Sequence, residues 1–194
     1  DSIVNQLGNP DDEEFERYGM VVGHVQAGKT GNYSSVICKA ADAGYKFIVV
    51  LSGTNSNLLR NQTQERINES FIGQNDDGLC GVGLGHKREH KDIPFRMTSD
   101  FLDFNKMTAN SLVGANFDTM NVPIALVIKK NATNLKSLIK WLTDQYKDII
   151  AKHSMLMIDD ESDYASVNTK AEDNPATINS QIRQLIALFG KSCY

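Results

Sequence analysis

Eight residues near the N-terminus, GHVQAGKT at Gly23–Thr30, fit the pattern G-x-x-x-x-G-K-[ST]. Glycines in such a loop let backbone amides point at phosphate oxygens, and a helix that starts at the loop adds the positive end of its dipole. In that arrangement Lys29 reaches the β- and γ-phosphates, and the Thr30 hydroxyl binds Mg²⁺. The residues expected to contact the nucleotide are Gly23, Gln26, Ala27, Gly28, Lys29, Thr30 and Gly31. The alternative interpretation is a tight glycine turn that carries a surface lysine.

A second group of candidate residues follows a later apolar run, where the chain reads DDESD at 159–163. A phosphate loop needs a metal partner, and an acid at the end of a second strand supplies it. We expect Asp160 to hold Mg²⁺ together with Thr30. We expect Glu161 to orient and activate the attacking water, so that Lys29 and Glu161 are the catalytic pair. The alternative interpretation is a helix N-cap followed by a solvated acidic first turn.

The elements around these motifs alternate between strand and helix. The loop is expected to follow a short buried strand, GMVVG at 19–23, and to open a helix whose apolar residues recur at helical spacing over 33–41. Continuous apolar runs predict further parallel strands at 46–53, 121–131 and 154–163. Apolar residues at helical spacing predict helices at 56–71, 135–149 and 175–189.

This order predicts the fold class. Two predicted strands separate the loop strand from the acidic strand in the chain, which favours the arrangement of motor ATPases over that of simple kinases. We therefore predict an α/β fold, a three-layer RecA-like P-loop NTPase domain with a mainly parallel sheet. Residues 1–194 are expected to form a single lobe with a lead-in at 1–18 and an irregular insertion at 74–120.

Composition narrows the setting. The 194 residues are 41% hydrophobic and carry a formal net charge of −4, so bulk charge gives nucleic-acid binding no support. Three widely spaced cysteines without a C-x-x-C pair argue against a disulfide framework and favour a reducing cytoplasm. No apolar run reaches the roughly 18 residues that a membrane span requires, so no membrane partner is expected.

The acidic motif resembles the D-E-x-D box of superfamily-two helicases, with Asp160, Glu161 and Asp163 in register. The segment LSGTNSNLLRNQTQER resembles the part of those proteins that touches the nucleic-acid backbone. That resemblance implies nucleic-acid contacts for Arg60, Gln62 and Arg66. The alternative is an ordinary polar outer face of a helix.

A closer resemblance covers most of the chain, from about Tyr18 to Ser166. The stretches that carry it are GHVQAGKTGNY, KAADAGYKFIVVLSGTNSNLLRNQTQERI, FIG, LVIKKN and IDDESD. Together they resemble the Z-one domain family, which is named for an endonuclease and occurs in large bacterial proteins with helicase-like ATPase cores. The resemblance implies ATP as the nucleotide and work on DNA.

The expected function is that of the ATP-binding N-terminal motor lobe of a helicase-like ATPase acting on DNA, with ATP and Mg²⁺ as cofactors. The chain begins with Asp1 and stops soon after its last predicted helix, so we expect a fragment of a longer multidomain protein. Its second RecA-like lobe would supply an arginine, and this lobe alone would bind ATP or ADP with hardly any turnover. Two alternatives remain open: a metal-dependent endonuclease that uses the 159–163 acids, and a nucleotide-gated interaction module.

Overall fold

The computed structural model describes residues 2–22, 28–86, 93–112, 114, 116–169 and 176–194. Among these residues, six parallel strands form one sheet in the order β1-β8-β7-β2-β6-β5. Their bounds are β1 Phe15–Arg17, β2 Phe47–Ser52, β5 Phe95–Arg96, β6 Ile124–Lys129, β7 Ser154–Asp159 and β8 Lys191–Cys193. A separate antiparallel hairpin pairs β3 (Gln74–Asn75) with β4 (Gly78–Leu79).

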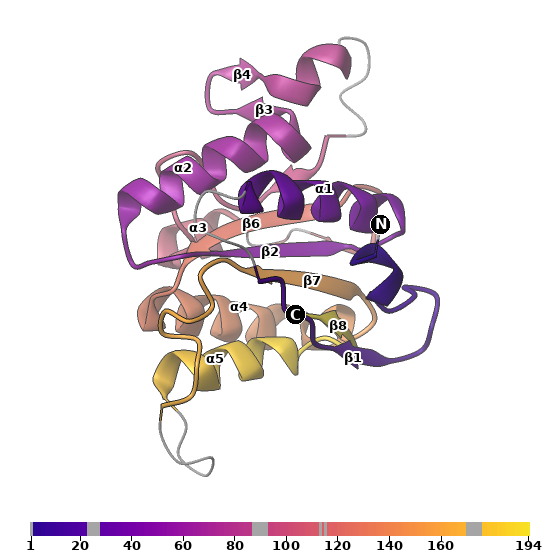
Figure 1. Cartoon of the computed structure of the whole chain (residues 1–194), viewed down its shortest axis with the longest axis vertical. Helices are drawn as coiled ribbons and strands as arrows, with labels where there is room; N and C mark the ends of the chain where they lie inside the picture. Colours follow the sequence, from indigo (N-terminus) through magenta and orange to yellow (C-terminus); the bar gives the residue numbers. More distant parts are fainter. Residues whose placement is uncertain (1, 23–27, 87–92, 113, 115, 170–175) are drawn as a thin grey trace.

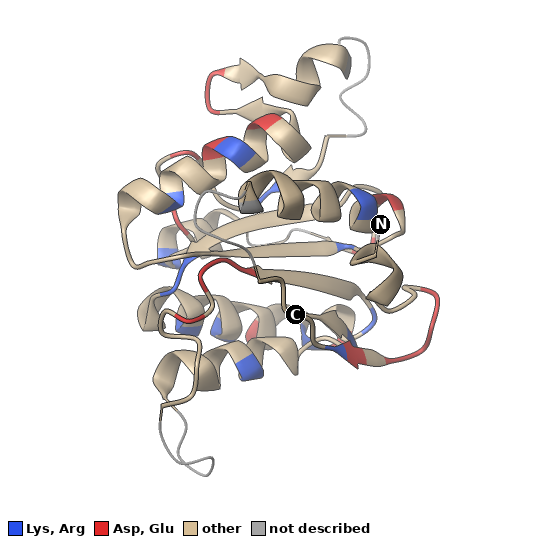
Figure 2. Cartoon of the chain, in the orientation of Figure 1, with Lys and Arg blue, Asp and Glu red and all other residues tan. Residues whose placement is uncertain are grey.

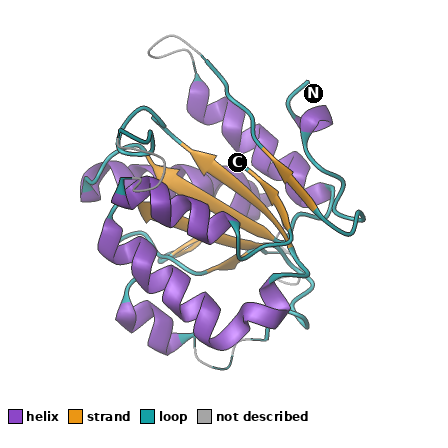
Figure 3. Cartoon of the chain, turned by 90° about the horizontal axis from the view of Figure 1, so that it is seen from below, coloured by secondary structure: helices purple, strands orange, loops and turns teal. Residues whose placement is uncertain are grey.

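Helices cover both faces of the sheet and make three layers (Figure 1 and Figure 3). The helices are α1 Lys29–Asp42, α2 Asn57–Ile67, α3 Lys106–Ser111, α4 Ala132–Ile150 and α5 Thr177–Ile186, with short helical turns η1 Val4–Gln6, η2 Asn68–Ile72 and η3 Gly81–His86. In Figure 1, α1 and α2 lie above the sheet, and α4 and α5 lie below it. The predicted three-layer α/β fold with a parallel sheet is therefore confirmed.

The core lies in two layers because the central strands are apolar on both faces. Alternate residues of β2 point into different clusters: Val49 packs with α4 and α5, whereas Val50 packs with α1. The whole of β2 is buried. These runs without polar alternation are what the sequence predicted for strands covered on both sides.

Capping residues mark the boundaries of several helices. The Ser56 hydroxyl caps α2 by accepting a hydrogen bond from the Leu59 amide at 3.5 Å. Gly44 follows α1 with φ of +101°, and Gly73 ends η2 with φ of +78°. Both residues are in the left-handed region, which glycine reaches without steric cost.

The predicted strand at 19–23 is wrong over its described residues. Met20, Val21 and Val22 are 83%, 57% and 86% exposed and belong to no strand. The first strand instead lies earlier, at Phe15–Arg17 within the predicted lead-in, where it pairs with β8. The paired residues of the β1–β8 ladder end at Arg17 opposite Cys193, and one further hydrogen bond joins the Gly19 amide to the Tyr194 carbonyl at 2.8 Å before the chain leaves the sheet.

Several other elements were not predicted either. One of them is β8, which lies between β1 and the acidic strand β7. Part of the region 74–120 is also more regular than expected, because β5 extends the main sheet beside β6 and α3 packs against α4. Phe104 and Phe117 from this region are buried in the main core.

Candidate functional site

The candidate site lies at the carboxyl edge of the sheet. Because all six strands are parallel, the ends of β2, β6 and β7 meet at this edge, as does the start of α1. Open α/β sheets bind ligands at the carboxyl ends of their strands. The described end of the phosphate-loop motif, at the start of α1, and the predicted acidic motif after β7 therefore belong to the same edge.

The helix that follows the phosphate loop begins as predicted. Gly28 is the N-cap of α1 with φ of +73°, a left-handed conformation that suits glycine, and Lys29 is the first helical residue. Gly31 lies in the exposed first turn. The residues Gly23, Gln26 and Ala27, and the side chain of Lys29, lie outside the described part of the structure.

Four polar side chains gather around the first turn of α1. The Tyr33 hydroxyl is buried, and this burial raises the pKa of Tyr33, as does the negative charge of Asp160. The Thr30 side chain and the Arg66 guanidinium act in the opposite direction on the same pKa. Thr30 and Asp160, the two residues predicted to hold Mg²⁺, thus both act on the pKa of Tyr33 in the first turn of α1.

The acidic turn after β7 is anchored by a lysine from the neighbouring strand. Lys130 directly follows β6, and its buried ammonium lies 2.6 Å from Asp159 Oδ1. It also donates hydrogen bonds to the carbonyls of Asp160 and Glu161 at 2.6 Å and of Tyr164 at 3.3 Å. One cation therefore fixes the backbone of the whole turn, and Figure 2 shows this acidic segment directly after β7.

Asp159 has a structural role in this turn. Its Oδ2 accepts a hydrogen bond from the Tyr194 hydroxyl at 2.5 Å, while its Oδ1 contacts Lys130. Burial raises the pKa of Tyr194, and so does the hydrogen bond to Asp159. Both carboxylate oxygens are thus engaged by protein groups, and the Asp159 side chain is only 4% exposed.

Glu161 occupies an unusual backbone conformation. Its φ is +51°, in the left-handed region that side chains other than glycine rarely adopt. Its carboxylate lies against Gly53 at the end of β2, where an added Cβ would come within 2.7 Å of Glu161 Oε2. The exposed Glu161 carboxylate therefore sits over the carboxyl edge, held there by the turn and by the space that Gly53 leaves.

The predicted nucleic-acid residues of α2 have three different environments. The interpretation of Arg60 as a surface contact is wrong, because its side chain is 1% exposed. Its guanidinium donates to carbonyl oxygens of Val127 at 3.0 Å, Ser99 at 2.6 Å, Asp100 at 3.2 Å and Leu102 at 3.2 Å, and to Gln64 Oε1 at 2.7 Å. Burial lowers the pKa of Arg60, although the charges of nearby aspartates oppose that shift.

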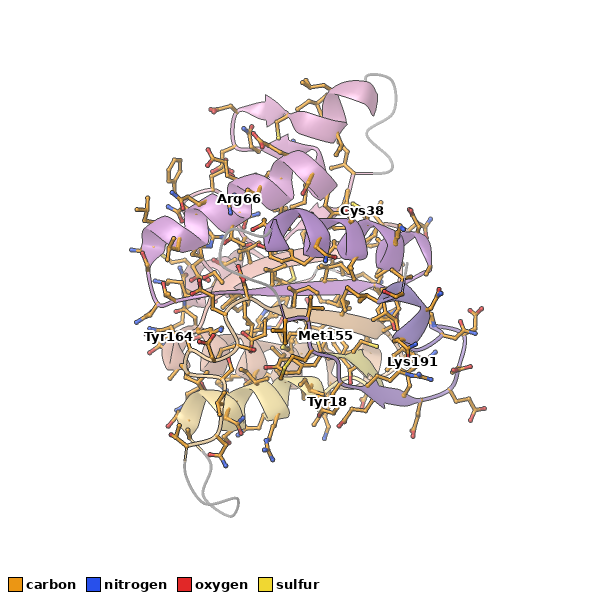
Figure 4. The ribbon with its side chains drawn as sticks, viewed as in Figure 1. Tyr18, Cys38, Arg66, Met155, Tyr164 and Lys191 are labelled. Carbon is orange, nitrogen blue, oxygen red and sulfur yellow. The ribbon has the colours of Figure 1, made fainter. Side chains whose placement is uncertain are left out.

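Gln62 and Arg66 are both exposed, as predicted, but Arg66 points to the nucleotide motif. Its Nη1 donates a hydrogen bond to Thr30 Oγ1 at 3.2 Å, and Figure 4 shows Arg66 on α2 above α1. A guanidinium at the first turn of α1 is suited to contact phosphate oxygens there. Its position thus connects α2 with the phosphate loop.

The four acids at 159–163 do not converge. Within the described residues, no group of three or more histidine, cysteine, aspartate or glutamate side chains is arranged to hold a metal ion. Asp159 is engaged by Lys130 and Tyr194, and Asp163 is exposed. This arrangement gives the two-metal endonuclease alternative no support.

Sequence reasoning missed Lys130 and Tyr194 as parts of the site. Two consecutive lysines, Lys129 and Lys130, at the end of a buried strand are a weak indication of a functional site. Only the folded structure reveals that Lys130 contacts Asp159 of β7. Tyr194 follows β8, which was not predicted either. Neither residue stands within a recognisable motif.

The described helices include none that has the length and apolar character needed to cross a bilayer. Comparison of the chain with protein-family models, with curated proteins and with solved structures finds no match. The assignment of function therefore rests on the two motifs and on the geometry of this edge.

Proposed function

We propose that this chain is an ATP-binding lobe of a helicase-like ATPase that acts on DNA. The observation that carries the proposal is the cluster at the start of α1. There, Thr30 from the phosphate-loop motif lies in the first turn of α1, and Asp160 from the acidic motif directly follows β7 at the same edge of the sheet, where its charge raises the pKa of Tyr33. A chance pattern match does not require a matching acid at the same place.

The donor set fits a magnesium ion. Thr30 supplies a hydroxyl and Asp160 a carboxylate, and hard oxygen ligands of this kind, completed by water and phosphate oxygens, are typical of Mg²⁺ sites. The bound ion would neutralise charge on the phosphates. Asp159 is excluded from this role because Lys130 and Tyr194 occupy its oxygens.

Glu161 is the best candidate to orient the attacking water. Its carboxylate is exposed at the carboxyl edge, whereas its backbone is fixed by Lys130. Backbone conformations of this rare kind persist where the surrounding structure imposes them, and they are frequent at active sites. Lys130 is then a positioning residue for both Asp160 and Glu161.

The arrangement of strands agrees with a motor-type lobe. β8 separates the first strand from the acidic strand β7, so the phosphate loop and the acids do not follow adjacent strands. We propose that a second RecA-like lobe of a longer protein closes on this edge and supplies an arginine to the γ-phosphate. DNA would contact the exposed face of α2, to which Gln62 belongs.

Equilibrium titration with ATP and MgCl₂ tests the nucleotide site. Lys29→Ala should weaken binding by at least about tenfold, equivalent to about 1.4 kcal/mol. Thr30→Val should weaken binding in MgCl₂ but have little effect in EDTA, because it removes only the hydroxyl. Lys39→Ala, on the same helix but two turns beyond the motif, is the matched control and should bind as the unmodified chain does. Equal binding by Lys29→Ala and Lys39→Ala would contradict the proposal.

Turnover separates the motor lobe from the alternatives. The chain alone should hydrolyse ATP hardly at all, because the proposed arginine comes from another lobe. Rapid hydrolysis by this chain, lost in Lys29→Ala, would show a complete site and contradict the two-lobe proposal. DNA cleavage in MnCl₂ without ATP, lost in Glu161→Gln but kept in Lys29→Ala, would favour the endonuclease. In the longer protein, ATP hydrolysis that no DNA stimulates would favour the nucleotide-gated module.

A further inference from the structure

An apolar cavity of about 390 Å³ lies beside the sheet where the first strand leaves it. Its walls include Ile3 and Leu7 of the N-terminal segment, Val21 after β1, Val36 of α1 and Ile158 of β7. Tyr194 also lines the cavity, and Figure 4 marks Tyr18, whose ring packs edge-on against that of Tyr194. The neighbouring Met20 and Val22 are 83% and 86% exposed, which is unusual for such residues beside a core.

The two sides of β7 differ at this cavity. On one side β7 pairs with β2 as far as Asp159 opposite Leu51. On the other side its ladder with β8 ends at Leu156 opposite Cys193. The last residues of β7 therefore present a sheet edge to the cavity, although the strand lies in the middle of the sheet.

The segment after β1 presents a second edge to the same space. Its ladder with β8 ends with two bonds: the Tyr194 amide donates to the Arg17 carbonyl and the Gly19 amide donates to the Tyr194 carbonyl, both at 2.8 Å. In a parallel strand, the backbone amide and carbonyl of one residue face one neighbouring strand, and those of the next residue face the other. The Gly19 amide faces β8, so the Val21 amide would face the same side if the strand continued. The cavity thus lies beyond the end of β8, between the backbone edge of β7 and the backbone edge of residues 18–22.

We propose that this cavity is the seat of an extended polypeptide segment that follows Tyr194 and continues β8 between β7 and residues 18–22. The apolar walls, the two open backbone edges and the exposed apolar side chains of Met20 and Val22 are all explained by one added strand. Strand addition would bring the residues before the phosphate loop into the sheet. On the proposed function, it would thereby fix the loop that holds the nucleotide.

The test is to add five residues, Val-Thr-Val-Thr-Val, after Tyr194 and to follow amide hydrogen exchange by NMR without nucleotide. The Asp160 amide donates to Leu51 of β2 at 3.1 Å, so the Asp159 amide faces the cavity by alternation. The added strand should slow exchange at Asp159 and Val21 at least tenfold. Exchange at Met20, whose amide faces away from the added strand, should remain fast.

The matched control adds Val-Pro-Val-Pro-Val, which has the same length and apolar residues but lacks two backbone donors. The proposal would be overturned if the amides of Val21 and Asp159 exchanged as fast in the Val-Thr-Val-Thr-Val variant as in the Val-Pro-Val-Pro-Val control or in the chain without an extension. Since no nucleotide is present, this outcome is independent of ATP binding. Failure of the ATP site would leave the exchange result unchanged, so the two proposals fail separately.

Discussion

Replacing Lys130 by methionine should unfold the acidic turn that carries Asp160 and Glu161. The Lys130 side chain is 0% exposed and pairs with Asp159, which is 4% exposed. Removal of one partner from a buried ion pair leaves an uncompensated charge, which costs about 3–5 kcal/mol. The three carbonyls that Lys130 contacts also lose their donor. We therefore expect Lys130→Met to lower the free energy of unfolding by about 3–5 kcal/mol.

Urea denaturation at neutral pH measures this change, and the adjacent lysine provides the control. Lys129 ends β6 and donates to Asn57 Oδ1 at 2.6 Å in an exposed pair. Lys129→Met should cost no more than about 1 kcal/mol, because exposed polar pairs contribute little. Adding Asp159→Asn to Lys130→Met removes the unpaired charge. The double variant should recover about 0.5–3 kcal/mol relative to the sum of the single changes.

The reasoning is refuted if Lys130→Met and Lys129→Met destabilise the chain equally, or if Asp159→Asn recovers nothing in the Lys130→Met background. Either result would mean that the buried ammonium does not hold the turn. In the absence of urea, the folded Lys130→Met variant should bind ATP more weakly than the unmodified chain if Lys130 positions Asp160. Unchanged binding would restrict Lys130 to a stabilising role.

Three further predictions concern single side chains. Glu161→Gly should be about 1–2 kcal/mol more stable than Glu161→Ala in urea denaturation, because glycine accepts the φ of +51° without strain. A Glu161→Ala variant at least as stable as Glu161→Gly would contradict this. Arg60→Met should lose about 2–4 kcal/mol because buried carbonyls lose their donors, whereas Gln62→Ala should change stability by less than about 0.5 kcal/mol. Burial and the charge of Asp42 raise the pKa of the Cys38 thiol above its ordinary value. Its alkylation by iodoacetamide, followed by mass spectrometry, should therefore still accelerate above pH 9, and a plateau below pH 8 would contradict this.

The sequence predicted the parts of the fold that depend on local pattern. The continuous apolar runs gave the positions of β2, β6 and β7, and the helix predicted at 56–71 begins within one residue of the start of α2 at Asn57. Burial on both faces leaves a direct record in such runs, because each residue of the strand must be apolar. The polar ends of these runs likewise placed Asp160 at the carboxyl edge.

The features that were missed depend on distant partners. Arg60 looks like a surface residue in sequence. Its burial depends on backbone carbonyls from residues 99–102, which accept hydrogen bonds from its guanidinium. β8 has three residues, Lys-Ser-Cys, and no apolar pattern. The exposed Met20–Val22 run reads as a strand because it is apolar, yet in the structure no strand pairs with it along its described length.

The pairing of the first strand with the last has a consequence for how the chain folds. β1 pairs with β8 and so joins the two ends of the described chain, whereas β2, β6 and β7 are neighbours closer in sequence. Contacts between distant segments form slowly, because the chain loses loop-closure entropy before the contacts contribute any stabilising free energy. During synthesis, β8 leaves the ribosome after the other strands that the structure describes, and β1 stays unpaired until then. We expect pulse-labelled hydrogen exchange to protect β2 before β1; simultaneous protection would contradict this order.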